Sequence, residues 1–176
     1  MPPALHAILV MGVSGVGKTT VAEVLAAKLG WEFIDGDAFH PASNVEKMRS
    51  GTPLTDDDRW PWFARLAAEI DRRRPAGEHV VIACSALKRT YRKALVGEDR
   101  DVLVIYLQGS RELIMSRLNE RKGHYFPASL LDSQFAALEE PDTSEHALIA
   151  GVEKNIDGLV EEILQRLDAH WKDTSG

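Results

Sequence analysis

The sequence is poor in cysteine, and this limits the classes of protein that it fits. Cys84 is the single cysteine among 176 residues, so no disulfide can form within the chain. Disulfides belong mainly to secreted proteins, and their exclusion fits a reducing compartment. Cys84 follows the apolar run 80–83, which indicates a buried core thiol rather than a reactive one.

The sequence also lacks an excess of positive charge and any long hydrophobic run. Lys and Arg number 21 against 27 Asp and Glu, a formal net charge of −6, whereas nucleic-acid-binding proteins usually carry a basic face. No run approaches the roughly 18 apolar residues of a membrane span, and the N-terminus has no basic leader. We therefore expect no nucleic-acid partner, no membrane segment and a cytoplasmic location.

What the sequence does have is an alternation of short apolar strands and amphipathic helices. With 44% hydrophobic residues the chain can fill one core, so we expect a single domain over 1–176. Strands are predicted over 7–11, 31–34, 80–84, 102–107 and 147–150. Helices are predicted over 20–29, 44–50, 59–74, 87–96, 111–121, 129–138 and 157–171. Helical crossovers imply parallel strands, so the sequence predicts a three-layer α/β fold with a five-stranded parallel sheet.

One polar segment, of about 122–145, is out of step with this alternation. It contains the predicted helix 129–138 but belongs to no strand–helix pair. Segments that close over an active site exclude water and complete the set of catalytic groups. We therefore expect 122–145 to be a mobile lid.

The stretch GVSGVGKT, residues 12–19, matches the phosphate-loop pattern G-x-x-x-x-G-K-[ST]. It stands between the first strand and the first helix, where backbone N–H groups and the helix N-terminus can bind a nucleotide's phosphates. This context disfavours the alternative, a glycine-rich turn with a chance lysine. Lys18 is predicted to reach the β- and γ-phosphates, and Thr19 to bind Mg²⁺. The predicted nucleotide-binding residues here are Gly12, Val13, Ser14, Gly15, Val16, Gly17, Lys18, Thr19 and Thr20.

Two aspartates, Asp35 and Asp37, flank Gly36 at the end of the second strand. The third strand ends in Ser85 rather than in an acidic residue, so these two carboxylates are the nearest candidates for metal and proton chemistry. Phosphoryl transfer depends on positioning and charge neutralisation, and a carboxylate can accept the proton of the acceptor hydroxyl. We predict Asp37 as the base and Asp35 nearer the metal. An Asx-rich turn is the structural alternative.

Other motifs separate a GTP-driven switch from a small-molecule kinase. The guanine-reading pattern N-K-x-D is absent, which disfavours the switch. A kinase needs an acceptor pocket and a basic lid, and RLNERKGHYF at 117–126 supplies Arg117, Arg121, Lys122 and His124. Arg117 and Arg121 are four residues apart on one helix face, where both can meet the nucleotide phosphates and stabilise the transferring charge. A solvated basic face is the alternative.

Four stretches and two later residues together closely resemble the gluconokinase family of phosphate-loop carbohydrate kinases. The stretches are GVSGVGKT, DGDAFHPASNVEKMRSGTPLTDDDRWPW, CSALKRTYR and RLNERKGHYF, and Gln134 and Phe135 follow them. The resemblance runs in order over nearly the whole chain, and the run 35–62 separates it from shikimate and adenylate kinases. It implies a nucleoside-monophosphate-kinase-like fold, a closing lid, a homodimer, and ATP-dependent phosphorylation of D-gluconate on its 6-hydroxyl to give 6-phosphogluconate.

The resemblance alone supports ATP over GTP, because nothing in the loop 151–155, on the predicted adenine side, distinguishes the two bases. Two competing hypotheses stay open. One is a related small-molecule kinase that acts on another sugar acid. The other is a regulatory protein that binds nucleotide without turnover.

The expected substrate carries one carboxylate and a row of hydroxyls, so its pocket needs a cation and several uncharged polar groups. We predict that Arg59 and His124 bind the substrate, with Lys88 as the next candidate. Pairing of Arg59 with Asp56 or Asp58 is the structural alternative. Further substrate-binding candidates are Asp37, His40, Arg92 and Gln134.

His40 and the pair of tryptophans near this pocket each have two possible roles. His40 either binds the sugar or orders the turn before Pro41. Trp60 and Trp62 are two residues apart on a helix and cannot share a face. One tryptophan therefore belongs to the core, and the other to a pocket wall or a dimer contact.

Overall fold

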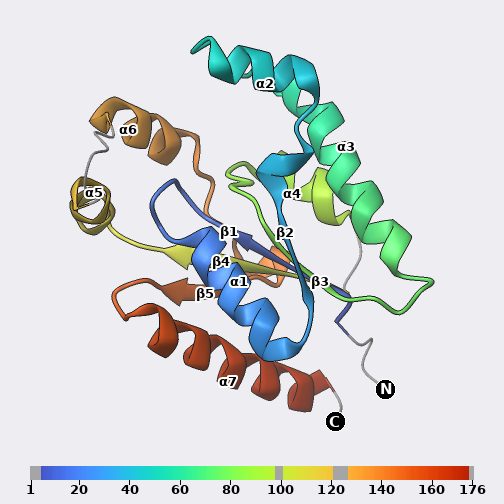
Figure 1. Cartoon of the computed structure of the whole chain (residues 1–176). Coiled ribbons are helices and arrows are strands. Elements are labelled where there is room, and N and C mark those ends of the chain that lie inside the picture. Colours follow the sequence, from blue (N-terminus) through green and yellow to red (C-terminus); the bar gives the residue numbers. More distant parts are fainter. Residues whose placement is uncertain (1–4, 98–100, 121–126, 175–176) are drawn as a thin grey trace.

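The computed structural model describes residues 5–97, 101–120 and 127–174 (Figure 1). Its five parallel strands have the order β2-β3-β1-β4-β5. They are β1 (Ala7–Met11), β2 (Glu32–Asp35), β3 (Val80–Ala83), β4 (Val102–Gln108) and β5 (Leu148–Gly151). The helices are α1 (Lys18–Leu29), η1 (Gly36–Phe39), α2 (Ala42–Arg49), α3 (Asp56–Arg73), α4 (Arg89–Val96), α5 (Arg111–Asn119), α6 (Ala128–Ala137), η2 (Thr143–Glu145) and α7 (Ile156–Thr174). The predicted fold class is confirmed.

The central strand β1 shows why the sheet is covered on both faces. All five of its residues are buried, and successive side chains point to opposite faces of a strand. Ile8 and Val10 pack in the core with α1, α5 and α7, whereas Leu9 and Met11 pack in the core with α3 and α4. A continuous apolar run is typical of a parallel strand buried on both sides. Figure 1 shows α7 and α2 at opposite sides of the molecule.

Cys84 and Trp62 are buried in this core, and Trp60 is not. The Cys84 thiol is buried, and burial raises its pKa to about 12, so the prediction of an inert core thiol is confirmed. Trp62 is buried in the α3 core, and its indole N–H donates to the carbonyl of Gly36 at 2.8 Å. Trp60 is exposed. Trp62 is therefore the core residue of the pair.

The observed helices begin and end within three residues of their predicted bounds. One informative difference is α4, which begins at Arg89 rather than at residue 87. Ala86 has a φ of 43°, in the left-handed region, so the chain cannot run helically through it. The loop 84–88 after β3 is therefore a fixed turn rather than the first turn of a helix.

Helix α3 starts with a strong cap that the sequence analysis did not identify. The Thr55 side chain accepts from the Asp58 N–H at 3.2 Å, and the Asp58 carboxylate accepts from the Thr55 N–H at 2.8 Å. This reciprocal pair is a capping box, which satisfies two backbone donors at the helix start. The start of α3 is thus fixed without the side chains of Asp56 and Arg59.

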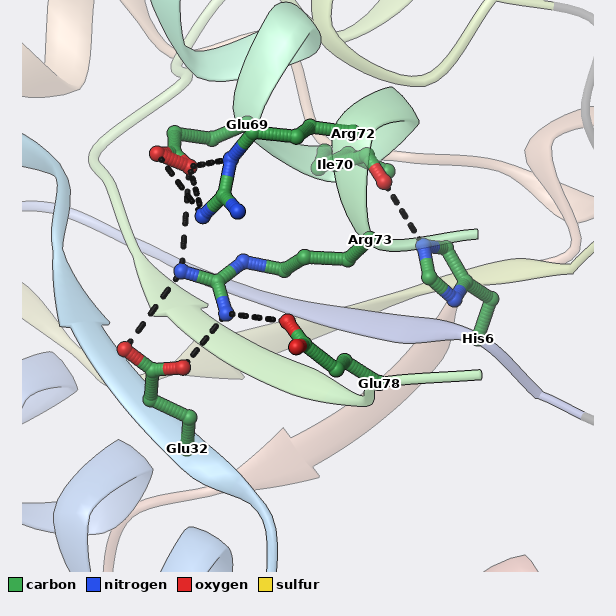
Figure 2. A network of polar contacts seen from close by, with 7 residues as sticks. All are labelled: His6, Glu32, Glu69, Ile70, Arg72, Arg73 and Glu78. Carbon is green, nitrogen blue, oxygen red and sulfur yellow. Dashed lines mark hydrogen bonds and ion pairs between the residues drawn. The ribbon is translucent and has the colours of Figure 1, made fainter. Parts of the chain in front are cut away.

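The C-terminal end of α3 is held by ion pairs of the buried Arg73 (Figure 2). Arg73 hydrogen-bonds Glu32 of β2, and lies 3.4 Å from Glu78 and 3.7 Å from Glu69. Only 5% of Arg73 is exposed. We call these four residues the Arg73 cluster. It ties the end of α3 to β2 and to the loop before β3.

In the part of the chain that the structure describes, no helix is both long and apolar enough to cross a membrane.

Candidate active site

The candidate site lies at the carboxyl ends of the strands. The phosphate loop follows β1, the short helix η1 follows β2, and the loop 84–88 follows β3. These three strands are neighbours in the sheet, in the order β2-β3-β1. In open parallel sheets, ligands bind in the crevice outside the carboxyl ends of the strands.

The phosphate loop has the backbone that its glycines permit. Gly15 and Gly17 have φ values of 83° and 100°, in the region that side chains strongly disfavour. A Cβ on Gly15 would also stand 2.7 Å from Leu118 of α5. The Lys18 ammonium donates to the carbonyl of Val13, 3.0 Å away. Burial lowers the pKa of Lys18, and the charges of Asp37 and Asp35 oppose this shift.

Gln134 of α6 was predicted to bind the substrate together with Arg59 and Lys88, and in the structure it contacts the phosphate loop. Its amide oxygen accepts from the Ser14 N–H at 2.6 Å, and its amide nitrogen donates to the Ser14 hydroxyl at 2.7 Å. Two hydrogen bonds to one residue fix the position of the side chain. The predicted lid helix is therefore tied to the loop that would hold the nucleotide.

The two aspartates after β2 have different surroundings. Asp35 Oδ1 accepts from the Asp37 N–H at 3.0 Å, so Asp35 caps η1 and forms the Asx-type turn named as its alternative. The Asp37 side chain is 80% exposed. Its carboxylate is therefore accessible to a substrate, and its charge acts on the pKa of Lys18.

His40 lies between Asp37 and α3. Its ring stacks on Trp62, with 3.8 Å between centroids. Asn44 donates to His40 Nδ1 at 3.3 Å, and because an amide nitrogen can only donate, the ring proton lies on Nε2. His40 Nε2 is 3.9 Å from Asp37 Oδ1. Burial lowers the pKa of His40, Asp37 opposes this shift and Arg59 adds to it.

Arg59 and Lys88 meet at Asp56, next to the ring of Tyr91. Arg59 Nη1 and Lys88 Nζ lie 3.6 Å and 3.8 Å from Asp56 Oδ1, and the Tyr91 hydroxyl donates to the same oxygen. Both cations are 5.5 Å from the centroid of the Tyr91 ring. We call these four residues the Asp56 cluster. The pairing of Arg59 with Asp56, which was the structural alternative, is thus present. The two candidate cations Arg59 and Lys88 lie beside the same carboxylate oxygen.

Tyr91 is the member of this cluster that the sequence analysis missed. It is 5% exposed and forms the buried floor under the two cations. Burial raises its pKa to about 12, with the hydrogen bond to Asp56 as the next cause. The only available signal was its position three residues after Lys88, within the stretch CSALKRTYR.

Arg92 is not available to a substrate, contrary to its inclusion among the candidates. It is 2% exposed, and its five N–H donors make five hydrogen bonds within the protein. The acceptors are Glu145, through both oxygens, and the carbonyls of Ala86, Leu87 and Glu139. Arg92 therefore joins the loop after β3 to the segment that follows α6.

The remaining predicted residues lie on the nucleotide side or outside the described residues. The guanidinium of Arg117 donates to the carbonyl of Val152, in the loop after β5. Thr19 and Thr20, in the first turn of α1, are exposed. Arg121, Lys122 and His124 fall in 121–126, outside the described part of the chain.

The oxygen donors near Lys18 suit a magnesium ion. Mg²⁺ usually binds one or two protein oxygens together with substrate phosphates and waters. The Thr19 hydroxyl is exposed at the phosphate loop, and the charge of Asp35 acts on the pKa of Lys18. Among the described side chains, no three His, Cys, Asp or Glu gather as ligands of an all-protein site.

The chain is similar to known proteins over nearly its whole length. A family model described as an AAA domain matches residues 8–141. The gluconokinase of Gluconobacter oxydans is 47% identical, over 92% of this chain and 91% of the relative. The thermoresistant gluconokinase of Escherichia coli is 40% identical, over 91% of this chain and 92% of the relative. A solved structure of a gluconokinase from Sinorhizobium meliloti has a TM-score of 0.86 and 40% identity, over 98% of both chains.

Proposed function

The chain belongs to the gluconokinase family, and from that premise we propose that it transfers the γ-phosphoryl group of ATP to the 6-hydroxyl of D-gluconate, giving 6-phospho-D-gluconate. One observation carries the proposal beyond family membership. A group suited to phosphoryl transfer and a group suited to a carboxylate are both close enough to act on His40. Asp37 Oδ1 is 3.9 Å from His40 Nε2, and the charges of both Asp37 and Arg59 act on the His40 pKa.

This combination of groups matches the chemistry of gluconate. The carboxylate and the 6-hydroxyl stand at opposite ends of a six-carbon chain. A pocket that binds both ends needs a cation at one end and a phosphoryl-transfer site at the other. Arg59 and Lys88 supply the cations, and Lys18 and Asp37 supply the transfer site. His40 Nε2, which carries the ring proton, is the proposed donor to a hydroxyl between them.

Each residue at the transfer end has a distinct task in this proposal. The backbone N–H groups of residues 12–20 bind the ATP phosphates, and Lys18 neutralises charge on the β- and γ-oxygens. Asp37 accepts the proton of the 6-hydroxyl as that oxygen attacks. Asp35, held by its bond to the Asp37 N–H, keeps the turn in place. Thr19 and Asp35 would hold Mg²⁺, which supplies further neutralisation of phosphate charge when bound.

The lid is proposed to span about 122–145 and to close over the bound substrates. Gln134 supports this proposal, because it bonds Ser14 across 120 residues of sequence. Arg117 and Arg121 would stabilise the transferring phosphoryl group, and His124 would reach the substrate. Protease cleavage within 122–145 should fall when MgATP and gluconate are both present. Unchanged cleavage would indicate a fixed insert.

A substrate panel tests the proposed activity directly. Purified protein with MgATP should release ADP when D-gluconate is added, and mass spectrometry should find one phosphate on the product. ADP release with a different sugar acid, and none with gluconate, would reassign the substrate. Tight ATP binding without ADP release for any acid would favour the nucleotide-binding regulator.

We also propose a homodimer that works in the cytoplasm, on the basis of the family resemblance. Exposed Trp60 is available for a subunit contact or a pocket wall. Sedimentation equilibrium measures the oligomeric state. A monomer at micromolar concentration would remove the dimer from the proposal without affecting the activity.

A further inference from the structure

The cations of the Asp56 cluster retain capacity for another anion. Their distances to Asp56 Oδ1, 3.6 Å and 3.8 Å, are longer than the usual 2.7–3.2 Å of an N–H···O hydrogen bond. Within the described part of the chain, Arg59 makes one hydrogen bond, to the Tyr91 hydroxyl at 3.4 Å. The side chains of Arg59 and Lys88 are 30% and 37% exposed. Arg92, in contrast, has every donor occupied.

The cluster also carries a definite net charge. Arg59 and Lys88 contribute two positive charges, and Asp56 contributes one negative charge. The neighbouring acid Asp58 does not alter this sum, because Lys47 pairs with it at 2.7 Å. Burial of Tyr91 raises its pKa to about 12, so it is neutral at physiological pH. One positive charge is therefore left for a ligand.

One positive charge suits a ligand with a single carboxylate. Specificity is a difference between affinities, and a group that weakens the binding of a competitor contributes to it. The repulsion from Asp56 is proportional to ligand charge, so a dianion is disfavoured by twice as much as a monoanion. Diacids, inorganic sulfate and phosphate esters all carry that second charge.

We propose that Asp56 is a specificity-determining residue, which lowers the net charge of the Arg59 and Lys88 site from two to one and so weakens the binding of dianions more than that of monocarboxylates. The proposal rests on the proposed function and deepens it, because it assigns the carboxylate end of gluconate to this cluster. Asp56 need not touch the substrate in this role. It acts through the charge that it places between the two cations.

Two small anions of similar shape test the proposal without turnover. Sulfate carries two charges and methanesulfonate carries one. Their dissociation constants are measured at constant ionic strength with saturating Mg²⁺ and a non-hydrolysable ATP analogue, whose three phosphates keep both anions out of the phosphate loop. Tryptophan fluorescence supplies the signal, because the Trp60 ring lies 5.8 Å from the Tyr91 ring. If the wild-type protein failed to phosphorylate gluconate, these titrations would still be informative.

Asp56→Asn should strengthen methanesulfonate binding by about threefold, and sulfate binding by the square of that factor, about tenfold. Asp57→Asn removes the same charge from the same turn of α3 and is the matched control. It should change both constants by less than about twofold, because exposed charges outside the cluster are screened. Asp57 has no role in the proposed site.

Lys88→Met gives the opposite test, and it applies even if Asp56→Asn fails to fold. Loss of a positive charge should weaken sulfate binding by about tenfold and methanesulfonate binding by about threefold. Equal changes for the two anions in either variant would overturn the proposal. So would an Asp57→Asn effect as large as that of Asp56→Asn. A gluconate KM raised more than tenfold by Asp56→Asn, with sulfate binding unchanged, would instead make Asp56 a direct ligand of the substrate.

Discussion

The two ends of α3 both carry an arginine among carboxylates, yet they differ in burial and in closeness of pairing. At the C-terminal end, Arg73 is 5% exposed and engages three glutamates (Figure 2). At the N-terminal end, the Arg59 side chain is 30% exposed and lies 3.6 Å from Asp56, its one carboxylate partner among the described residues. The first end is closed by protein groups, and the second is open to solvent.

Burial and the number of protein partners distinguish a structural arginine from a ligand-binding one. A buried guanidinium must find partners within the protein, because an unpaired buried charge is costly. An exposed guanidinium near a single carboxylate keeps hydrogen-bond donors that a ligand can use. Arg92 and Arg73 belong to the first kind, and Arg59 to the second. Helix α3 is thus anchored at its closed end and presents charge at its open end.

The largest effect should come from Asp37, the exposed carboxylate whose Oδ1 lies 3.9 Å from His40 Nε2. Asp37→Asn removes the proposed base and should lower kcat by about 10³-fold, a typical contribution of general base catalysis. ATP binding should be unchanged, because the phosphate loop is untouched. Steady-state kinetics with gluconate and an ATP titration measure the two quantities. Full activity in this variant would remove Asp37 from the catalytic assignment.

The next largest effect should come from breaking the closed end. Arg73→Met removes charged hydrogen bonds to glutamates, of which Glu32 and Glu78 are more than half exposed and can be solvated, and should lower the free energy of unfolding by about 2 kcal/mol. The gluconate KM should change by less than about twofold, because the Arg73 cluster lies at the opposite end of α3. Urea unfolding and steady-state kinetics give the two values. A large rise in KM without loss of stability would contradict the structural assignment.

The matched change at the open end should have the reverse profile. Arg59→Met removes a charged hydrogen-bond donor from the proposed carboxylate site and should raise the gluconate KM by about 20-fold. The free energy of unfolding should change by less than about 1 kcal/mol, because exposed ion pairs contribute little. If Arg59→Met destabilised the protein as much as Arg73→Met, the comparison between the ends would fail.

Much of this arrangement could be predicted from the sequence, because the signals were local. The apolar run 7–11 and GVSGVGKT lie next to each other, so strand, loop and helix follow from neighbouring residues. Asp35 and Asp37 were predicted near the nucleotide for the same reason. They follow a parallel strand, and the carboxyl ends of such strands meet at one edge of the sheet.

The functions of the arginines were harder to predict, because burial depends on distant segments. Arg92 was predicted as a substrate candidate, but its guanidinium donates to the carbonyl of Glu139 and to the carboxylate of Glu145, more than 45 residues away. Gln134 likewise reaches Ser14 from 120 residues away. Helical spacing shows which residues share a face, but it does not show which partner covers that face.

A smaller prediction concerns Asp58, a well-paired residue at the open end. The hydrogen bond from Lys47 holds the pKa of Asp58 at about 2, below its ordinary value of 3.8, and the Thr55 N–H adds to this effect. A lowered carboxylate pKa stabilises the folded state above the unfolded pKa, and the stabilisation is lost as the pH falls through the folded pKa. Asp58 should therefore contribute fully at pH 7 and progressively less between about pH 4 and pH 2.

Asp58→Asn should lower the melting temperature at pH 7 by about 1–3 °C, since it weakens the capping box and the pair with Lys47. This difference from wild type should be constant above about pH 5 and should shrink as the pH is lowered toward 2. Asp57→Asn is the control, because Asp57 takes no part in the capping box. Thermal melts at several pH values provide the measurement. A difference that grows toward acid pH would mean that the pKa of Asp58 is raised, and that the start of α3 is held by packing rather than by charge.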